Sequence, residues 1–98
     1  MPFFRVMLCG IGISLPAEDG SDPAIGFYTT RDVFAANAEN ASKKAIDLVL
    51  KHWKPGGSYA AANQGAVPIL TLDKSWRVGY LYGLFGRKPS GYVFYSHE

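Results

Sequence analysis

The sequence predicts one small α+β domain of order β-β-α-β-β, with a four-stranded, mainly antiparallel sheet and one helix on one face. Three observations support this fold class. The 98 residues have room for a single core, so we expect one domain over residues 1–98. Aromatic and β-branched runs at both ends of the chain are typical of strands. One central stretch has the apolar period of an amphipathic helix.

The first predicted strand covers residues 3–15 (FFRVMLCGIGISL), which are almost wholly apolar, as in a strand at the centre of a sheet. Gly10 and Gly12 weaken the interior of this strand and predict a bulge or bend. Residues 16–24 (PAEDGSDPA) combine prolines, an Asp-Gly pair and three acids, so we expect an exposed turn there. A second strand is predicted over residues 26–36 (GFYTTRDVFAA).

The helix is predicted to begin after Asn37, which can cap its first turn. It should end near Lys54, because Pro55 disfavours helical geometry at the residue before it. Its apolar positions recur at helical offsets: Ala41, Ala45, Leu48, Val49 and either His52 or Trp53.

The C-terminal half is predicted to hold the other two strands. Residues 58–65 are small and polar, as in a loop, and could include one helical turn. Residues 67–78 alternate between apolar and polar and predict a strand, with Lys74 out of phase. Residues 79–90 are rich in glycine and aromatic residues and predict an irregular connection, and residues 91–96 (GYVFYS) form the last strand. We expect a two-layer, ferredoxin-like arrangement, whose uncovered sheet face would receive a partner or a second copy of the chain.

Composition excludes several classes of protein. The formal net charge of +2 is too small to imply a nucleic-acid partner by itself. The single cysteine, Cys9, permits no internal disulfide and no cysteine-based zinc site, which suits a reducing cytoplasm. We find no signal-peptide pattern and no apolar run of about 20 residues, the length of a membrane span. We therefore expect a cytoplasmic protein without a membrane segment.

No group of residues has the spacing of a catalytic, metal or cofactor site. The two glycines of the first strand lack the third glycine and the helix of a dinucleotide-binding turn. The acids of residues 18–22 do not follow the ligand spacing of a calcium loop. Cys9, His52 and His97 cannot be paired with confidence into a nucleophile and a base, so a small hydrolase or transferase is the least favoured hypothesis. We predict a protein that is not an enzyme and that binds no metal or cofactor.

Residues 74–95 have the one uneven distribution in the chain: four cations, no acid and seven of its aromatic residues. Tyrosine, tryptophan and arginine are enriched at protein interfaces, and cations alternating with rings also suit single-stranded nucleic acid. The other interpretation is structural: every second aromatic ring faces the core, and the charged ends of the lysine and arginine side chains lie in solvent as on any protein surface. The residues predicted to bind a partner are Arg31, Trp76, Arg77, Tyr80, Tyr82, Phe85, Arg87 and Lys88.

Arg31 is included because it shares a strand face with Phe27 and Val33. On such a face it pairs with an acid, for example Asp73, or it remains free. Pairing is the simpler expectation. If free, its planar guanidinium would offer a fork for a carboxylate or phosphate beside Tyr28.

The strand motif GFYTTR at residues 26–31 and the final motif GYVFY at residues 91–95 resemble a group of small bacterial proteins of unknown function. This resemblance covers the ends of the chain and implies no activity. At the level of fold, the plan is also similar to antitoxins and to small phage inhibitors of bacterial defence. We therefore predict a non-catalytic protein-binding module of inhibitor, immunity or antitoxin type, which could form a homodimer. The alternative is a single-stranded nucleic-acid-binding protein.

Overall fold

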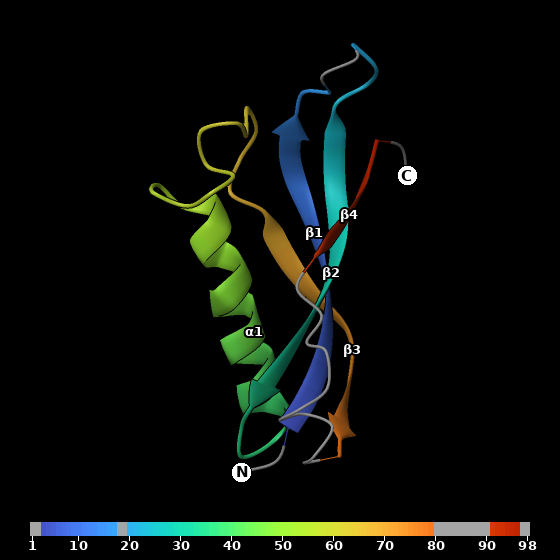
Figure 1. Cartoon of the computed structure of the whole chain (residues 1–98), viewed down its shortest axis with the longest axis vertical. Coiled ribbons are helices and arrows are strands. Elements are labelled where there is room, and N and C mark those ends of the chain that lie inside the picture. Colours follow the sequence, from blue (N-terminus) through green and yellow to red (C-terminus); the bar gives the residue numbers. More distant parts are fainter. Residues whose placement is uncertain (1–2, 18–19, 80–90, 97–98) are drawn as a thin grey trace.

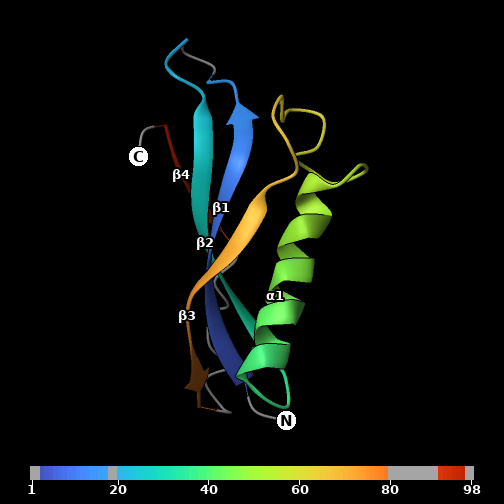
Figure 2. The same ribbon diagram turned by 180° about the vertical axis from the view of Figure 1, so that it is seen from behind.

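The computed structural model describes residues 3–17, 20–79 and 91–96. A four-stranded sheet forms one layer and a single helix lies alongside it as the second layer, as Figures 1 and 2 show from opposite sides. The chain forms in turn β1 (Phe3–Leu15), β2 (Ala24–Phe34), α1 (Ala38–Trp53), β3 (Ile69–Val78) and β4 (Tyr92–Tyr95). In the described part of the chain, no helix is long and apolar enough to cross a membrane. The α+β class with a four-stranded antiparallel sheet and one helix is confirmed.

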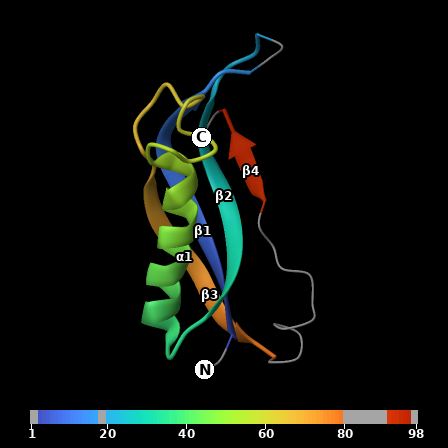
Figure 3. The same cartoon turned by 60° about the vertical axis from the view of Figure 1, so that its left-hand side comes forward.

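The ferredoxin-like arrangement is wrong. The strand order is β3-β1-β2-β4 and each described pairing is antiparallel. A ferredoxin-like fold has two crossover helices in the order β-α-β-β-α-β. Here α1 makes the one crossover that the described residues contain, from β2 over β1 to β3. Because β2 and β3 both run antiparallel to β1, they are parallel to each other, and the helix returns the chain to the end where β2 began. Figure 3 shows β4 at the opposite edge, beside β2.

The core lies between α1 and the sheet. Asn37 caps the helix as predicted, since its side chain accepts a hydrogen bond from the Asn40 backbone N–H at 2.9 Å. The helix ends at Trp53, two residues before Pro55. Alanines in its first half allow close approach to the strands, and larger side chains fill the second half. The buried helix residues are Ala41, Ala45, Val49 and Trp53, and they pack against Phe4, Val6, Leu8, Phe27 and Val33 of the sheet.

The predicted irregularity of β1 occurs later than Gly10. Gly10 remains in register, opposite Phe27 of β2, and the register shifts only between Ile11 and Leu15. Gly12 lies in this irregular part with a φ of 93°, a conformation that glycine adopts without strain. A side chain at Gly10 would overlap the ring of Phe27. Gly10 therefore serves packing across the sheet.

A bulge in β3 changes which residues share a face. Lys74 pairs with Met7 and Leu72 pairs with Leu8, so the residue between them, Asp73, is extra in the ladder. The predicted alternation therefore breaks in the middle of the strand. Leu72 lies toward α1, where it lines a groove with helix residues, whereas Trp76 lies on the other face of the sheet.

The segment between α1 and β3 is tied to the end of β1. Asn63 makes the central contact, because its Oδ1 accepts hydrogen bonds from the backbone N–H groups of Ser14 (2.9 Å) and Gly65 (3.0 Å). A single helical turn precedes it, closed by a bond from the Asn63 N–H to the Tyr59 carbonyl at 3.0 Å. The ring of Tyr59 stacks on Trp53, with centroids 4.8 Å apart. This loop therefore extends the core beyond the helix.

Candidate functional site

The face of the sheet opposite α1, here called the helix-free face, presents apolar side chains from all four strands. We assign residues to this face from the strand register and from the alternation of side chains along each strand. A residue next to a core-facing residue in a strand has its side chain on the opposite face. Across the sheet they lie in neighbouring sets: Ile69 beside Ile11; Thr71 beside Cys9, Tyr28 and Val93; Lys74 beside Met7 and Thr30; Trp76 beside Arg5 and Asp32.

Several large side chains on this face are exposed. Val93 is 68% exposed and Ile69 is 67% exposed, while Tyr28, Ile11 and Trp76 are between 41% and 47% exposed. Together they make up five of the nine large apolar side chains that are exposed in the described part of the chain. A scattered exposed apolar residue is ordinary, but a group that spans a whole sheet face is typical of an interaction surface.

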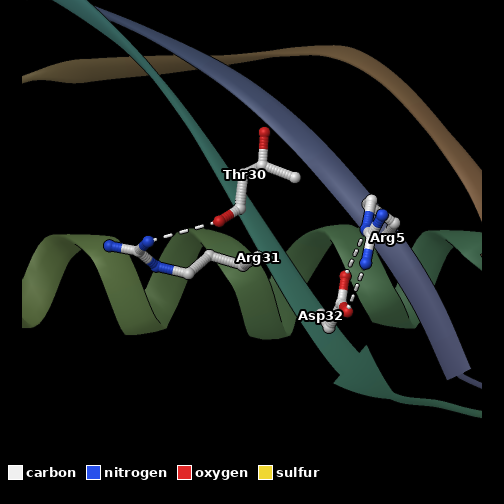
Figure 4. Close-up of polar contacts among 4 residues, drawn as sticks. All are labelled: Arg5, Thr30, Arg31 and Asp32. Atoms are coloured by element: carbon white, nitrogen blue, oxygen red, sulfur yellow. Dashed lines mark hydrogen bonds and ion pairs between the residues drawn. The ribbon is translucent and has the colours of Figure 1, made fainter. Parts of the chain in front are cut away.

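The charges on the helix-free face largely cancel. Arg5 donates two parallel hydrogen bonds to the Asp32 carboxylate, from Nε to Oδ1 at 2.9 Å and from Nη2 to Oδ2 at 3.0 Å, as Figure 4 shows. The Asp32 side chain is 1% exposed and that of Arg5 is 19% exposed. The exposed Lys74 adds one positive charge nearby. As far as the described residues show, this face is therefore mainly apolar and only weakly basic.

Arg31 lies on the opposite side of β2, between the sheet and α1. Its residue is 6% exposed, and Figure 4 shows its side chain extending alongside the helix and away from the Arg5–Asp32 pair. Nη1 donates to the Thr30 carbonyl at 3.2 Å, and Nη2 has no hydrogen-bond partner. The expected pairing with Asp73 is wrong, because that residue is exposed in the bulge of β3.

Tyr92 provides the ring next to Arg31, in place of the expected Tyr28. The guanidinium carbon lies 5.1 Å from the centroid of the Tyr92 ring, a cation–π contact. The Tyr92 hydroxyl is 2.7 Å from Nδ1 of His52, in the last turn of α1. Burial raises the pKa of the Tyr92 hydroxyl above 10.0, and Arg31 and the Trp53 indole offset only part of this effect. The indole nitrogen of Trp53 is buried without a partner in hydrogen-bond geometry.

The structure places three of the eight predicted partner-binding residues, and it does not bring them together. Trp76 lies on the helix-free face, Arg31 is buried on the helix side, and Arg77 is exposed on the helix side at the β3 edge, opposite Phe4. The other five lie outside the described residues, as does His97: Tyr80, Tyr82, Phe85, Arg87 and Lys88.

Sequence reasoning missed four exposed residues of the helix-free face: Ile11, Tyr28, Ile69 and Val93. The sequence does carry a signal for them. In these strands the odd-numbered and the even-numbered positions are both largely apolar, although the helix covers only one side of the sheet. Without the register, the core-facing set cannot be distinguished from the other. Cys9 is partly buried on this face between Thr71 and Tyr28.

Comparisons with family models, with curated proteins and with solved structures find no match to this chain. The proposals below therefore depend on the chain's own residues.

Proposed function

We propose that this protein is a non-catalytic binding module that acts by occupying another protein, in the manner of an inhibitor, an immunity protein or an antitoxin. The observation that carries the proposal is the exposed apolar group on the helix-free face, to which every strand contributes. Its members are Ile11, Tyr28, Ile69, Trp76 and Val93.

The chemistry of this face favours a protein partner over nucleic acid. Burying a large apolar side chain contributes about 1.5–3 kcal/mol, and tyrosine and tryptophan are the residue types most enriched among interface anchors. Binding to nucleic acid depends on several cations that neutralise phosphates. On the helix-free face Arg5 is engaged with Asp32, which leaves Lys74 as the available cation in the described part of the chain. The expected partner therefore presents an apolar surface with an acid placed to meet Lys74.

The proposal can be tested with charged substitutions on the two faces of the sheet. Ile69→Glu and Val93→Glu place a carboxylate in the helix-free face, where both side chains are about two-thirds exposed. Leu72→Glu is the matched control, because Leu72 is 44% exposed on the same strand as Ile69 but lies toward α1. Tagged proteins are incubated with native extract, with and without nuclease, and the captured proteins are identified and their affinities measured with purified partner.

We expect one protein to bind the unmodified chain and the Leu72→Glu variant, and to lose at least about tenfold in affinity with Ile69→Glu or Val93→Glu, a loss of about 1.4 kcal/mol. Equal loss in all three variants would contradict the assignment of the surface. Binding abolished by nuclease would instead support single-stranded nucleic acid. Sedimentation of the purified chain as a dimer that Ile69→Glu dissociates would identify a second copy as the occupant.

A further inference from the structure

The outer side of β3 is a sheet edge that no described strand covers. β3 ends the strand order beside α1, and each of its described pairings is with β1 (Figure 2). In an antiparallel ladder, alternate residues direct their backbone N–H and C=O groups to opposite sides of the strand, so about half of the residues in β3 direct theirs away from β1. Unpaired backbone groups at an edge bond readily to another extended chain. β3 therefore offers a template for an added strand.

The bulge at Asp73 limits this template to the second half of the strand. Residues 74–78 pair with β1 in unbroken register and include no proline. The side chains of Lys74, Trp76 and Arg77 in this stretch are exposed. Bulges and charged side chains restrict unwanted pairing at sheet edges, and a stretch of about five residues matches the length of an ordinary strand.

A groove of about 380 Å³ lies between this edge and α1. Leu72 and Ser75 of β3 form one wall, so the same strand supplies both the open edge and the groove. The other wall carries no net charge, because its one cation and its one acid form an exposed ion pair at 3.6 Å. The helix residues of this wall are Ala38, Glu39, Ser42, Lys43 and Ile46. Between Ile46 and the 44% exposed Leu72, the groove suits an uncharged apolar side chain.

Strand geometry determines which side chains of an added strand meet this groove. Ser75 and Arg77 are opposite the core residues Val6 and Phe4 of β1, so both lie on the helix side of the sheet. Side chains on one face recur every two residues, and directly opposite Cβ atoms lie about 4.5–5.5 Å apart. A side chain opposite Ser75 therefore lies at the groove, and the next one on that face lies beside the exposed guanidinium of Arg77.

We propose that residues 74–78 of β3 receive an extended segment of a partner protein as an added strand, which inserts an apolar side chain into the groove between β3 and α1. The segment runs antiparallel to β3, which is the commoner and slightly more stable pairing. An acid two residues before the apolar residue then pairs with Arg77. The site stands independently of the proposed function, because it uses the edge of the sheet and not the helix-free face.

The pattern of an acid two residues before an apolar residue favours a partner over a second copy of this chain. Within the described strands it occurs once, from Asp32 to Phe34 of β2. That stretch is already paired with β1, and the Asp32 side chain is 1% exposed and bonded to Arg5. The complementary segment therefore comes from another protein.

The test titrates the intact ¹⁵N-labelled chain with the peptide acetyl-TTETLTT-amide, in which the acid stands two residues before the leucine. We expect saturable shifts of backbone amide resonances in β3 and the first half of α1, and slower amide hydrogen exchange at alternate residues of 74–78. Replacing the leucine of the peptide by asparagine should weaken binding at least about tenfold, because the groove then receives a polar side chain. This change leaves the protein itself unaltered.

Backbone methylation distinguishes an added strand from a side chain that enters the groove alone. Two versions of the peptide carry N-methyl groups at alternate residues, one at the odd and one at the even positions. In an added strand only one of these two sets of N–H groups faces β3. One version should therefore bind at least about tenfold more weakly, and the other about as tightly as the parent peptide. Equal binding of the two versions would overturn the strand pairing.

Variants of the chain locate the site. Leu72→Glu places a carboxylate in the groove and should abolish peptide binding, whereas Val93→Glu, on the helix-free face, should leave it unchanged. The proposed function predicts the opposite response of its partner to these two variants, so failure of either proposal is distinguishable. Arg77→Met should weaken binding about two- to fivefold and should bind TTETLTT and TTQTLTT equally, as expected for one exposed ion pair.

Four results would count against the proposal. No saturable shift, undiminished binding to Leu72→Glu, or full affinity of the asparagine peptide would overturn it. Sedimentation of the purified chain as a dimer that the peptide dissociates would identify a second copy as the occupant of the edge, and would overturn the assignment to a partner protein.

Discussion

Gly10 shows how one missing side chain organises the packing around it. A Cβ at this position would overlap the ring of Phe27, which lies across the ladder. Because that space is empty, the Phe27 ring can stack on Trp53 with centroids 5.2 Å apart and planes within 1°. The two rings join β2 to the last turn of α1 and form the aromatic end of the core.

Gly10→Ala should therefore destabilise the protein by about 1–3 kcal/mol, the usual cost of overpacking a well-filled core. Gly79→Ala is the matched control, because a Cβ there meets no atom within 4 Å, and its effect should stay within about 0.5 kcal/mol. Urea unfolding monitored by circular dichroism measures both values. Equal stability of the two variants would show that the Phe27 ring moves aside without cost.

The Arg5–Asp32 pair offers a second test at the residue scale. Asp32→Asn keeps the shape of the side chain but removes the negative charge that faces Arg5, and breaking a buried pair in this way costs about 3–5 kcal/mol. Because the Arg5 side chain is 19% exposed, we expect the lower end of that range. Glu39→Gln breaks the exposed Lys43–Glu39 pair, at 3.6 Å, and should cost less than about 1 kcal/mol. Similar unfolding free energies for both variants would contradict this ranking.

At the scale of elements, β4 depends on side chains for its attachment. It has four residues, and its pairing with described residues is limited to Gly26 to Thr29 of β2. Strand pairing of this length is marginal alone. Tyr92 adds an edge-to-face contact with Phe27 at 4.9 Å and the hydrogen bond to His52. One tyrosine thus connects β4 to both β2 and α1.

Tyr92 should make this attachment sensitive to alkaline pH. Its pKa in the folded chain is raised above 10.0, so the unfolded chain loses the phenolic proton first. The protonated Tyr92 hydroxyl therefore contributes to the free energy of unfolding. This contribution is complete below pH 10.0 and is lost as the pH rises through the folded-state pKa of Tyr92. Tyr92→Phe should cost about 1 kcal/mol at neutral pH, through the lost hydrogen bond.

The same substitution should also reduce the fall in stability at alkaline pH. Urea unfolding of both proteins from about pH 8 to pH 11.5 measures the difference. Tyr28→Phe, at a 47% exposed position, is the control and should retain the alkaline slope of the unmodified chain. Parallel pH profiles for Tyr92→Phe and the unmodified chain would contradict the assignment to Tyr92.

At the scale of the whole molecule, the two faces of the sheet have different environments, and each holds one tryptophan. Trp53 is 2% exposed on the helix side, whereas Trp76 is 41% exposed on the helix-free face. The bulge at Asp73 produces this separation, because it shifts the later residues of β3 by one position relative to the alternation.

Fluorescence quenching should report the two environments separately. In Trp53→Phe the remaining Trp76 should be strongly quenched by acrylamide, while in Trp76→Phe the remaining Trp53 should be protected. Trp76→Phe should change stability by less than about 0.5 kcal/mol, because it alters an exposed position. In urea both variants should be quenched equally, which provides the control. Protection of Trp76 in the folded chain would contradict its placement on an open face.

The sequence predicted most of what depends on neighbouring residues. The bounds of β1 agree with the apolar run of residues 3–15, and α1 lies between its cap at Asn37 and the stop before Pro55. The candidate site was less predictable. Trp76 was identified as a partner-binding residue from composition, but Ile11 and Val93, which are exposed on the same face, belong to strands distant in the chain.

Local residue patterns therefore determined the number, type and approximate ends of the elements, because capping, chain stiffness and apolar period act over a few residues. The tertiary structure alone decided the strand order, the faces of β3 and the state of Arg31. The position of Asp73 in the β3–β1 ladder moves Trp76 to the open face, and no acid in the described part of the chain pairs with Arg31. These properties depend on contacts between residues far apart in the chain, whose energies become defined only when the sheet and helix pack together.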